Sequence, residues 1–450
     1  MKLIETIRNI WKIEDLKTRI LTTLGFLLVY RLGSFVVLPG IDPTMLNNLK
    51  DQTSKGVMGL LDMFSGGAFS NASVVALGIM PYISASIVVQ LLGIAVPYFQ
   101  RLQREGESGH RKINQITRYL TVVILILQGI AYMANLKAQI PAEAFVVGFD
   151  SMLFKVTSIV LLAAGTMFVM WLGERITDRG IGNGISLIIM IGIIARLPHS
   201  ATAELLSRLS PGNVGGPVML LIELVILFFV FVGTIMLVQG TRRIPVQYAK
   251  RIVGNKQIGG VRQYIPLKVN AAGVMPIIFA QAIMFIPITI AGFVDSESST
   301  SALAVVFGDF TGFWYNFTFA LLIILFTYFY TAITVNPTQM AEDMKRNGGF
   351  IPGVKPGRKT VEFIDSVMSK ITLPGSVFLA LVAILPAFAM LAGVESSFAQ
   401  FYGGTSLLIL VGVVLDTLQQ IESHLLMRHY DGLLKSGRIK GRTAGGGGMY

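Results

Sequence analysis

Residues 76–92 read Ala-Leu-Gly-Ile-Met-Pro-Tyr-Ile-Ser-Ala-Ser-Ile-Val-Val-Gln-Leu-Leu. An apolar run of this length predicts a membrane helix, and Pro81 is expected to interrupt its hydrogen-bond ladder and kink it. Ile79 and Ile83 are four residues apart, so they share one helical face. A shorter apolar segment, residues 56–70, precedes this helix and carries two adjacent glycines near its end. A short helix, a glycine hinge and a kinked helix together suggest a gate.

Apolar stretches of membrane length recur along the whole 450-residue chain. The chain is 53% hydrophobic and only 14% charged, and its mean hydropathy is +0.66. The stretches do not alternate between polar and apolar residues, so helices are expected rather than the strands of a barrel. The sequence predicts an all-α polytopic membrane protein with ten transmembrane helices, near residues 20–38, 74–97, 119–136, 153–173, 184–198, 217–239, 271–293, 313–335, 373–393 and 404–427.

Residues that would mark an enzyme or a metal site are scarce. The chain has no cysteine, and its four histidines are scattered. Residues 353–360 resemble a phosphate-binding loop, but three residues separate their glycines where the motif needs four. Structural or interfacial roles are favoured over ion relay for the carboxylates in or near the spans, Glu223, Asp416 and Glu422. We therefore expect no enzymatic activity, no cofactor and no metal.

The basic side chains are unevenly distributed, and their distribution predicts an orientation. Of 37 Lys and Arg residues, 30 fall in the N-terminus, the connections after even-numbered spans and the C-terminal tail. The positive-inside rule places these segments in the cytoplasm, so both termini are expected there. Residues 1–19 combine five basic side chains with an apolar stripe, which predicts an amphipathic helix on the membrane surface. Residues 431–450 are expected to form a cytoplasmic tail.

Two of the connections on the cytoplasmic side, residues 241–270 and 337–372, are longer than ordinary turns. The first contains seven basic residues and no Asp or Glu. Such loops attract anionic lipid, and they also suit the docking of a large anionic partner such as ribosomal RNA, or of a soluble motor. The residues alone leave both interpretations open.

Six strings, in order, resemble the SecY family of bacterial protein-conducting channels. The resemblance runs from about residue 15 to about residue 430 and preserves the order of the ten expected spans. The strings are Met63-Phe-Ser-Gly-Gly67, Ala76-Leu-Gly-Ile-Met-Pro-Tyr-Ile-Ser-Ala-Ser86, Arg104-Glu-Gly-Glu-Ser-Gly109, Gly180-Ile-Gly-Asn-Gly-Ile-Ser186, Pro266-Leu-Lys-Val-Asn270 and Tyr402-Gly-Gly-Thr-Ser-Leu-Leu-Ile409.

The resemblance implies an hourglass pore between two pseudo-symmetric halves, residues 20–205 with spans one to five and residues 206–430 with spans six to ten. The halves would hinge between spans five and six. A lateral gate would open between spans two and three on one side and spans seven and eight on the other. A ring of branched apolar side chains dewets and resists ions, yet offers a passing chain no specific hydrogen bonds. The family's pore ring falls on Ile79, Ile83, Ile185, Ile189, Ile278 and Ile409.

The resemblance also implies a short plug helix, at about residues 57–70, that fills the outer funnel of the pore at rest. Two glycines would supply its hinge, since glycine tolerates backbone angles that other residues avoid. The alternative for this segment is a static re-entrant helix. The residues assigned to plug and hinge are Leu60, Leu61, Met63, Phe64, Gly66 and Gly67.

Partners follow from the same resemblance. SecE and SecG subunits, the SecA ATPase, the ribosome, signal sequences, nascent polypeptides and anionic lipids are expected, in the bacterial inner membrane. Lys355 stands where family members commonly have arginine, and lysine lacks the planar fork of donors. The residues assigned to ribosome and motor docking are Arg242, Arg243, Lys250, Arg251, Lys256, Lys355 and Arg358.

The function implied is passage of unfolded secretory polypeptides across the membrane, with lateral release of transmembrane segments into lipid. A secondary transporter of small solutes is the main alternative, and it would need a buried ionisable group for coupling. A non-conducting scaffold that recruits ribosomes would explain the basic loops but not the isoleucine ring or the plug.

Overall fold

The structure is a computed structural model of the whole chain. It describes residues 13–46, 62–145, 151–210, 216–248, 251–253, 256–258, 262–281, 283–284 and 311–435. Several predictions made above lie outside these residues. They concern most of the N-terminal amphipathic helix, the start of the plug with Leu60 and Leu61, the docking residue Lys250, the end of the seventh span and the last part of the tail.

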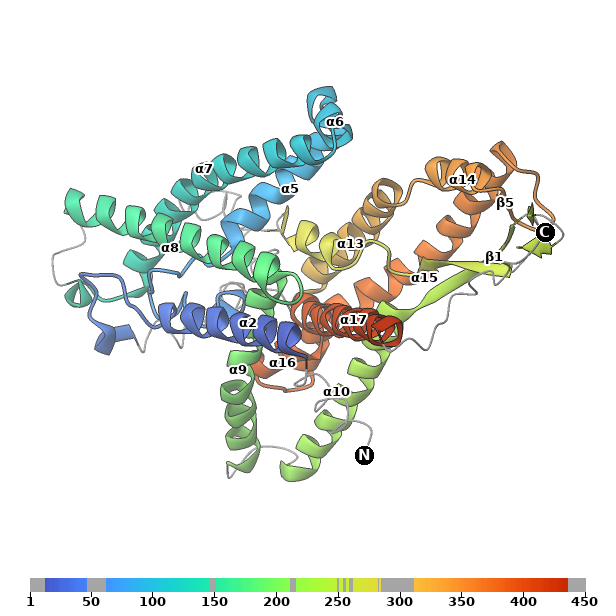
Figure 1. Cartoon of the computed structure of the whole chain (residues 1–450). Helices are drawn as coiled ribbons and strands as arrows, with labels where there is room; N and C mark the ends of the chain where they lie inside the picture. The colour runs from blue at the N-terminus through green and yellow to red at the C-terminus, as the bar shows by residue number, and fades with distance from the viewer. Residues whose placement is uncertain are drawn as a thin grey trace.

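Helices dominate the fold, because a long apolar run can satisfy its backbone hydrogen bonds inside a membrane only as a helix. Figure 1 shows them packed side by side with many connections at their ends. The helices are α2 (Glu14–Gly33), α5 (Met80–Ala95), α6 (Pro97–Arg104), α7 (Glu107–Gln139), α8 (Met152–Arg179), α9 (Gly184–Leu209), α10 (Gly216–Gln239), α13 (Phe313–Thr334), α14 (Pro337–Arg346), α15 (Arg358–Leu391), α16 (Ser396–Ala399) and α17 (Gly404–Lys435), with short 3-10 turns η1 (Pro43–Leu46), η2 (Ala142–Ala144) and η3 (Gln400–Tyr402).

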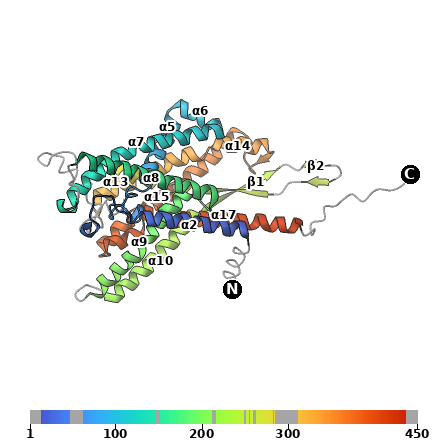
Figure 2. The same ribbon diagram turned by 60° about the vertical axis from the view of Figure 1, so that its left-hand side comes forward.

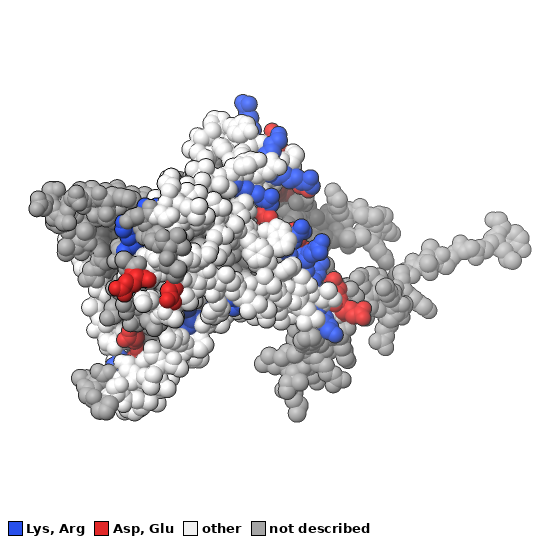
Figure 3. Space-filling model, turned by 90° about the vertical axis from the view of Figure 1, so that its left-hand side faces the viewer, with Lys and Arg blue, Asp and Glu red and all other residues white. Residues whose placement is uncertain are grey.

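Among the described residues, seven helices are long and apolar enough to cross a membrane, or eight if the bent pair α5–α6 counts as one span. The pair bends by 100° between residues 93 and 97. Figure 3 shows a broad uncharged band between the charged side chains at the two ends of the molecule, as expected for a surface that faces lipid. The multi-span prediction is therefore confirmed, and the full count of ten stays a prediction.

The expected kink in the helix at residues 76–92 is wrong. The helix begins at Met80, and Pro81 lies in its first turn, where its missing N–H group is not needed. A series of turns precedes it, with Gly78 at a φ of +51°. The N–H of Ile83 still donates to the carbonyl of Ile79 at 3.1 Å, so the two isoleucines are one helical turn apart, as the spacing predicts.

The basic connection at residues 241–270 forms strands, which an all-α fold does not predict. Strands β1 (Thr241–Tyr248) and β4 (Arg262–Lys268) pair antiparallel, and β2 (Arg251–Val253) pairs with β3 (Lys256–Ile258). Ile244 and Val246 are buried against Met344 and Ile364. Figure 2 shows β1 and β2 projecting beyond the helices, toward the side where α17 also ends.

The second long connection joins the same sheet. Strand β5 (Gly349–Phe350) pairs antiparallel with the end of β1, which gives the strand order β4-β1-β5. The two basic connections, 241–270 and 337–372, are therefore parts of one structure rather than independent loops. Because α14 and α15 flank β5, this sheet is anchored to the helical body.

Helix α9 holds the central position. It contacts α2 and α8 on one side and α10, α16 and α17 on the other. The largest central apolar cluster gathers around α9 and draws side chains from α2, α8, η3 and α17 as well. This packing positions the candidate site described next.

Candidate functional site

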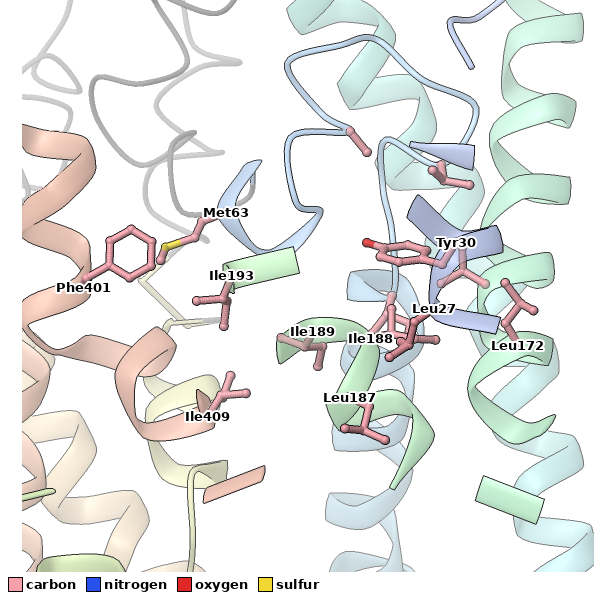
Figure 4. Close-up of a cluster of buried hydrophobic side chains, with 14 of the residues drawn as sticks. Leu27, Tyr30, Met63, Leu172, Leu187, Ile188, Ile189, Ile193, Phe401 and Ile409 are labelled. Carbon is pink, nitrogen blue, oxygen red and sulfur yellow. The ribbon is translucent and has the colours of Figure 1, made fainter. Parts of the chain in front are cut away.

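A central apolar cluster joins segments that are far apart in the sequence. Ile79, Ile189 and Ile409 are buried in it, and Ile83 and Ile185 pack against it half-buried. Figure 4 shows Ile189 of α9 near the middle of the cluster, with Ile409 of α17 toward the side of Phe401 and Leu172 of α8 on the other side. The structure thus brings together five of the six residues predicted for the pore ring.

The Gly-Ile-Gly-Asn-Gly string between α8 and α9 places two of these isoleucines. Gly180 caps the C-terminus of α8, and the Asn183 side chain caps α9 by accepting the N–H of Ile185 at 3.1 Å. A Cβ at Gly184 would lie 2.0 Å from the carbonyl oxygen of Gly173. Only glycine lets α9 begin this close to α8, and this fixes where Ile185 and the following turns of α9 lie.

Ile278 departs from the predicted ring. It is half-buried, on the helical turn formed by residues 275–281, and it is not among the described side chains that pack in the central cluster. Val274, whose carbonyl accepts the N–H of Ile278 at 3.4 Å, does pack there. The seventh expected span therefore reaches the cluster one turn earlier than the motif predicts.

Residues 62–79, which we call the re-entrant segment, fold back against the cluster without spanning the molecule. Met63 is buried in the cluster and Phe64 packs against it. Figure 4 shows the Met63 side chain pointing toward Phe401. The buried hydroxyl of Tyr30 on α2 donates to the carbonyl of Ser65 at 3.1 Å, which ties the segment to the first described helix.

The two adjacent glycines of this segment have positive φ angles, +65° at Gly66 and +90° at Gly67. A Cβ at Gly66 would lie 2.8 Å from the Cα of Gly192 on α9. The pair therefore allows both a left-handed turn and a close approach of two backbones. The structure gives the glycines this packing role, and their use as a hinge stays a prediction.

Charged side chains hold the re-entrant segment at places that the sequence analysis did not single out. Asp62 is buried and forms an ion pair with Arg196 of α9. One Arg196 nitrogen, Nη2, also donates to the Ser70 hydroxyl at 3.0 Å, and Arg31 Nη1 of α2 donates to the carbonyl of Gly66 at 2.5 Å. Isolated arginines inside apolar runs are costly unless paired, and this was the available sequence signal.

A second buried ion cluster lies where α9 meets α10. Arg208 Nε is 2.8 Å from Glu204 Oε1, and Arg208 Nη2 is 2.5 Å from Glu223 Oε1 and 2.6 Å from the carbonyl oxygen of Gly393. Glu204 Oε2 accepts the backbone N–H of Glu395 at 2.7 Å. The cluster ties α9 to α10 and to the connection after α15.

The other two spanning carboxylates behave differently from Glu223. Asp416 is exposed on α17 and accepts a hydrogen bond from Gln420 at 3.3 Å, and Glu422 is also exposed. Among the described residues, no group of three or more His, Asp or Glu side chains is placed to hold a metal ion.

The residues predicted for docking lie on and beside the sheet. Arg242 and Arg243 are exposed on β1, and Lys355 and Arg358 are exposed where β5 leads into α15. Arg358 is 3.6 Å from Glu362, a pair with little solvent protection. Arg251 and Lys256 belong to the small β2–β3 hairpin. The structure therefore gathers two basic connections into one exposed surface, the basic sheet surface.

Comparison with known proteins resolves the family. A family profile described as SecY matches residues 73–418. The chain belongs to the SecY family. It is 42% identical to the protein translocase subunit SecY of Streptomyces scabiei, over 94% of this chain and 98% of that one.

Solved structures share the fold of this SecY family member. One is titled "The structure of a protein conducting channel", with a TM-score of 0.55 at 18% identity, covering 94% of this chain and 95% of that one. Another is an idle yeast Ssh1 complex bound to the yeast 80S ribosome, with a TM-score of 0.57 at 13% identity, covering 90% and 89%.

Proposed function

We propose that the central apolar cluster is the constriction through which unfolded polypeptides pass, and that residues 62–70 are the plug. As a member of the SecY family, the chain is a multi-span protein-conducting channel subunit of a translocase. The observation that carries the residue-level proposal is the meeting of Ile79, Ile189 and Ile409 from three distant segments, with Met63 of the re-entrant segment among them.

The chemistry of this constriction suits a conduit for polypeptides. Branched apolar side chains leave a narrow opening without water, which is a large barrier to ions. They make no directional bonds, so no client sequence is favoured by hydrogen bonding. A small-solute transporter would instead need a buried ionisable group facing its site. Among the charged side chains described at the proposed plug, Asp62 and Arg196 pair with each other.

Lateral release needs two faces that can part. Among the described helices, the extensive contacts between the two halves are made by α9, which touches α10, α16 and α17. Within the described residues, no extensive contact links α5 or α7 with α13. This arrangement supports a gate between these helices, through which an apolar client segment would enter lipid at a gain of about 25 cal/mol for each Å² removed from water.

The basic sheet surface is the proposed docking site for the ribosome and for SecA. Its exposed arginines and lysines suit the phosphates of ribosomal RNA, and the yeast Ssh1 complex of the same fold binds a ribosome. We further propose SecE and SecG as partner subunits, the bacterial inner membrane as the location and the cytoplasm for both termini. The positive-inside distribution of Lys and Arg supports this orientation.

Single-cysteine crosslinking tests the conduit directly, because the chain has no native cysteine. Cysteine would replace Ile79 or Ile409, with Phe228 of α10, which is 64% exposed, as the lipid-facing control. A stalled secretory chain should crosslink at the two cluster positions, in a manner that tracks its length and requires its signal sequence, and not at the control. Absence of crosslinks at both cluster positions in an intact, partner-bound complex would reject the conduit.

A further inference from the structure

Asp62 begins the re-entrant segment and is only 1% exposed. A buried carboxylate is costly unless it is paired and hydrogen-bonded. Both of its oxygens are engaged, one in the ion pair with Arg196 and the other by the backbone N–H of Ser70 at 2.8 Å. Asp62 therefore closes the loop of residues 62–70 on itself and attaches it to α9 at the same time.

Arg196 of α9 contacts the same loop at two points. Besides the ion pair, its Nη2 donates to the Ser70 hydroxyl, so one guanidinium binds both ends of the loop. The two backbones also approach closely at Gly66 and Gly192, and Met63 and Phe64 add apolar contacts with the cluster around α9. The polar attachment of the loop to α9 is thus concentrated at the Asp62–Arg196 pair.

A second arginine also contacts this loop, so that two positive side chains and one carboxylate meet there. Arg31 reaches the loop from α2, where Nη1 donates to the Gly66 carbonyl and the guanidinium lies 5.2 Å from the centre of the Phe35 ring. Asp62 thus belongs to a loop that one arginine holds from α9 and another from α2. When the loop moves away it carries Asp62 with it, and the two arginines remain on α2 and α9.

We propose that Asp62 and Arg196 form a latch that holds the plug in place and sets how often the resting channel opens. The inference rests on the proposed assignment of residues 62–70 as the plug. The pair lies seven residues beyond Ile189 on α9, about 10 Å along the helix. It therefore positions the plug without forming part of the constriction. Opening separates the pair, and the uncompensated charge of Arg31 and Arg196 favours the return of Asp62.

Ion leak through the resting complex in proteoliposomes, without ribosome or client, measures the latch. Asp62→Asn keeps the size and the acceptor for Ser70 but removes the charge, and Arg196→Met removes the partner charge. Each should raise the leak about tenfold, within the usual range of coupling for a contacting pair. Arg196→Lys, which keeps the charge, should leak much less than Arg196→Met. Asp42→Asn, at a half-buried carboxylate in the connection after α2 that accepts hydrogen bonds from Thr44, is the control and should not leak.

The double variant Asp62→Asn/Arg196→Met decides whether the two residues act together. A latch predicts that it leaks no more than either single variant, because one interaction is lost in all three. A leak equal to the product of the single effects would overturn the proposal. So would loss of signal-driven translocation in parallel with the leak, since that pattern indicates misfolding rather than a freed plug.

Deletion of residues 63–69 separates failure of the latch from failure of the plug assignment. If the deletion raises the leak and Asp62→Asn does not, the latch is refuted and the plug stands. If neither raises the leak, both are refuted. A leak in both, with the non-additive double variant, supports the latch.

Discussion

Replacing Arg208 with methionine removes the cation that two buried glutamates share. Arg208 is 8% exposed, and Glu204 and Glu223 are 1% and 2% exposed. Three of its contacts, to Glu204, Glu223 and Gly393, are 2.5–2.8 Å long. Loss of one partner of a buried ion pair costs about 3–5 kcal/mol, because the remaining charge has no compensation. Glu204 keeps its hydrogen bond from the backbone N–H of Glu395 at 2.7 Å, so we expect the lower end of this range, about 3 kcal/mol, roughly a hundredfold in the folding equilibrium.

Reversible denaturant titration of the purified complex in detergent measures this cost, with helix content as the signal. The triple variant Glu204→Gln/Arg208→Met/Glu223→Gln removes the stranded charges and should recover most of the stability. Arg118→Met is the matched control, since its pair with Glu174 is half-exposed and should cost less than about 1 kcal/mol. Equal stability of Arg208→Met and the unaltered chain would refute the reasoning. So would a triple variant no more stable than Arg208→Met alone.

Three further predictions concern the constriction, the plug contact and the sheet. Ile189→Ser should raise the ion leak of resting proteoliposomes, because a hydroxyl lets water enter the apolar cluster. Gly192→Ala should destabilise the resting form by about 1–3 kcal/mol, since its Cβ would lie 3.0 Å from the Phe64 carbonyl oxygen. Thermal melting and ion-leak assays measure the effect. Gly25→Ala is the control and should change neither the melting temperature nor the leak, because nothing lies within 4 Å of its Cβ. Val246→Asp should abolish ribosome co-sedimentation by unfolding the sheet, because Val246 is fully buried, whereas Tyr264→Asp at an exposed position should only weaken it.

The sequence predicted the helices well, because each membrane helix is specified locally by its own apolar run. The apolar run did not show where the helix at Pro81 begins. Proline can kink a helix or lie in its first turn, and here the turn at Gly78 precedes the helix, so Pro81 lies in the first turn. The pairing of β1 with β4 was missed because each strand has only two inward-facing apolar residues, Ile244 and Val246 in β1 and Ile265 and Leu267 in β4, within a strongly basic segment.

The sequence alone did not predict which residues from distant segments come into contact. Four-residue spacing placed Ile79 and Ile83 on one face, but their meeting with Ile409 was expected only from the family resemblance. The ion pair of Asp62 and Arg196 joins residues 134 positions apart, and neither has a local pattern that names its partner. Arginine in an apolar run signals that some partner exists, but only the fold identifies it.

Helix α15 is 34 residues long, which corresponds to about 51 Å against a hydrocarbon core of about 30 Å. It starts beside β5, at the basic sheet surface, and ends two residues before Gly393, whose carbonyl binds Arg208. Figure 1 shows this continuous path from the sheet into the helical body. If a bound partner tilts the sheet, α15 would transmit that tilt along its length toward the other end of the helical body. Pro374 and Pro386 are the places where the helix is expected to bend. One helix thereby links the sheet surface with the Arg208 ion cluster, and near its end Ala389 and Met390 pack against the central apolar cluster.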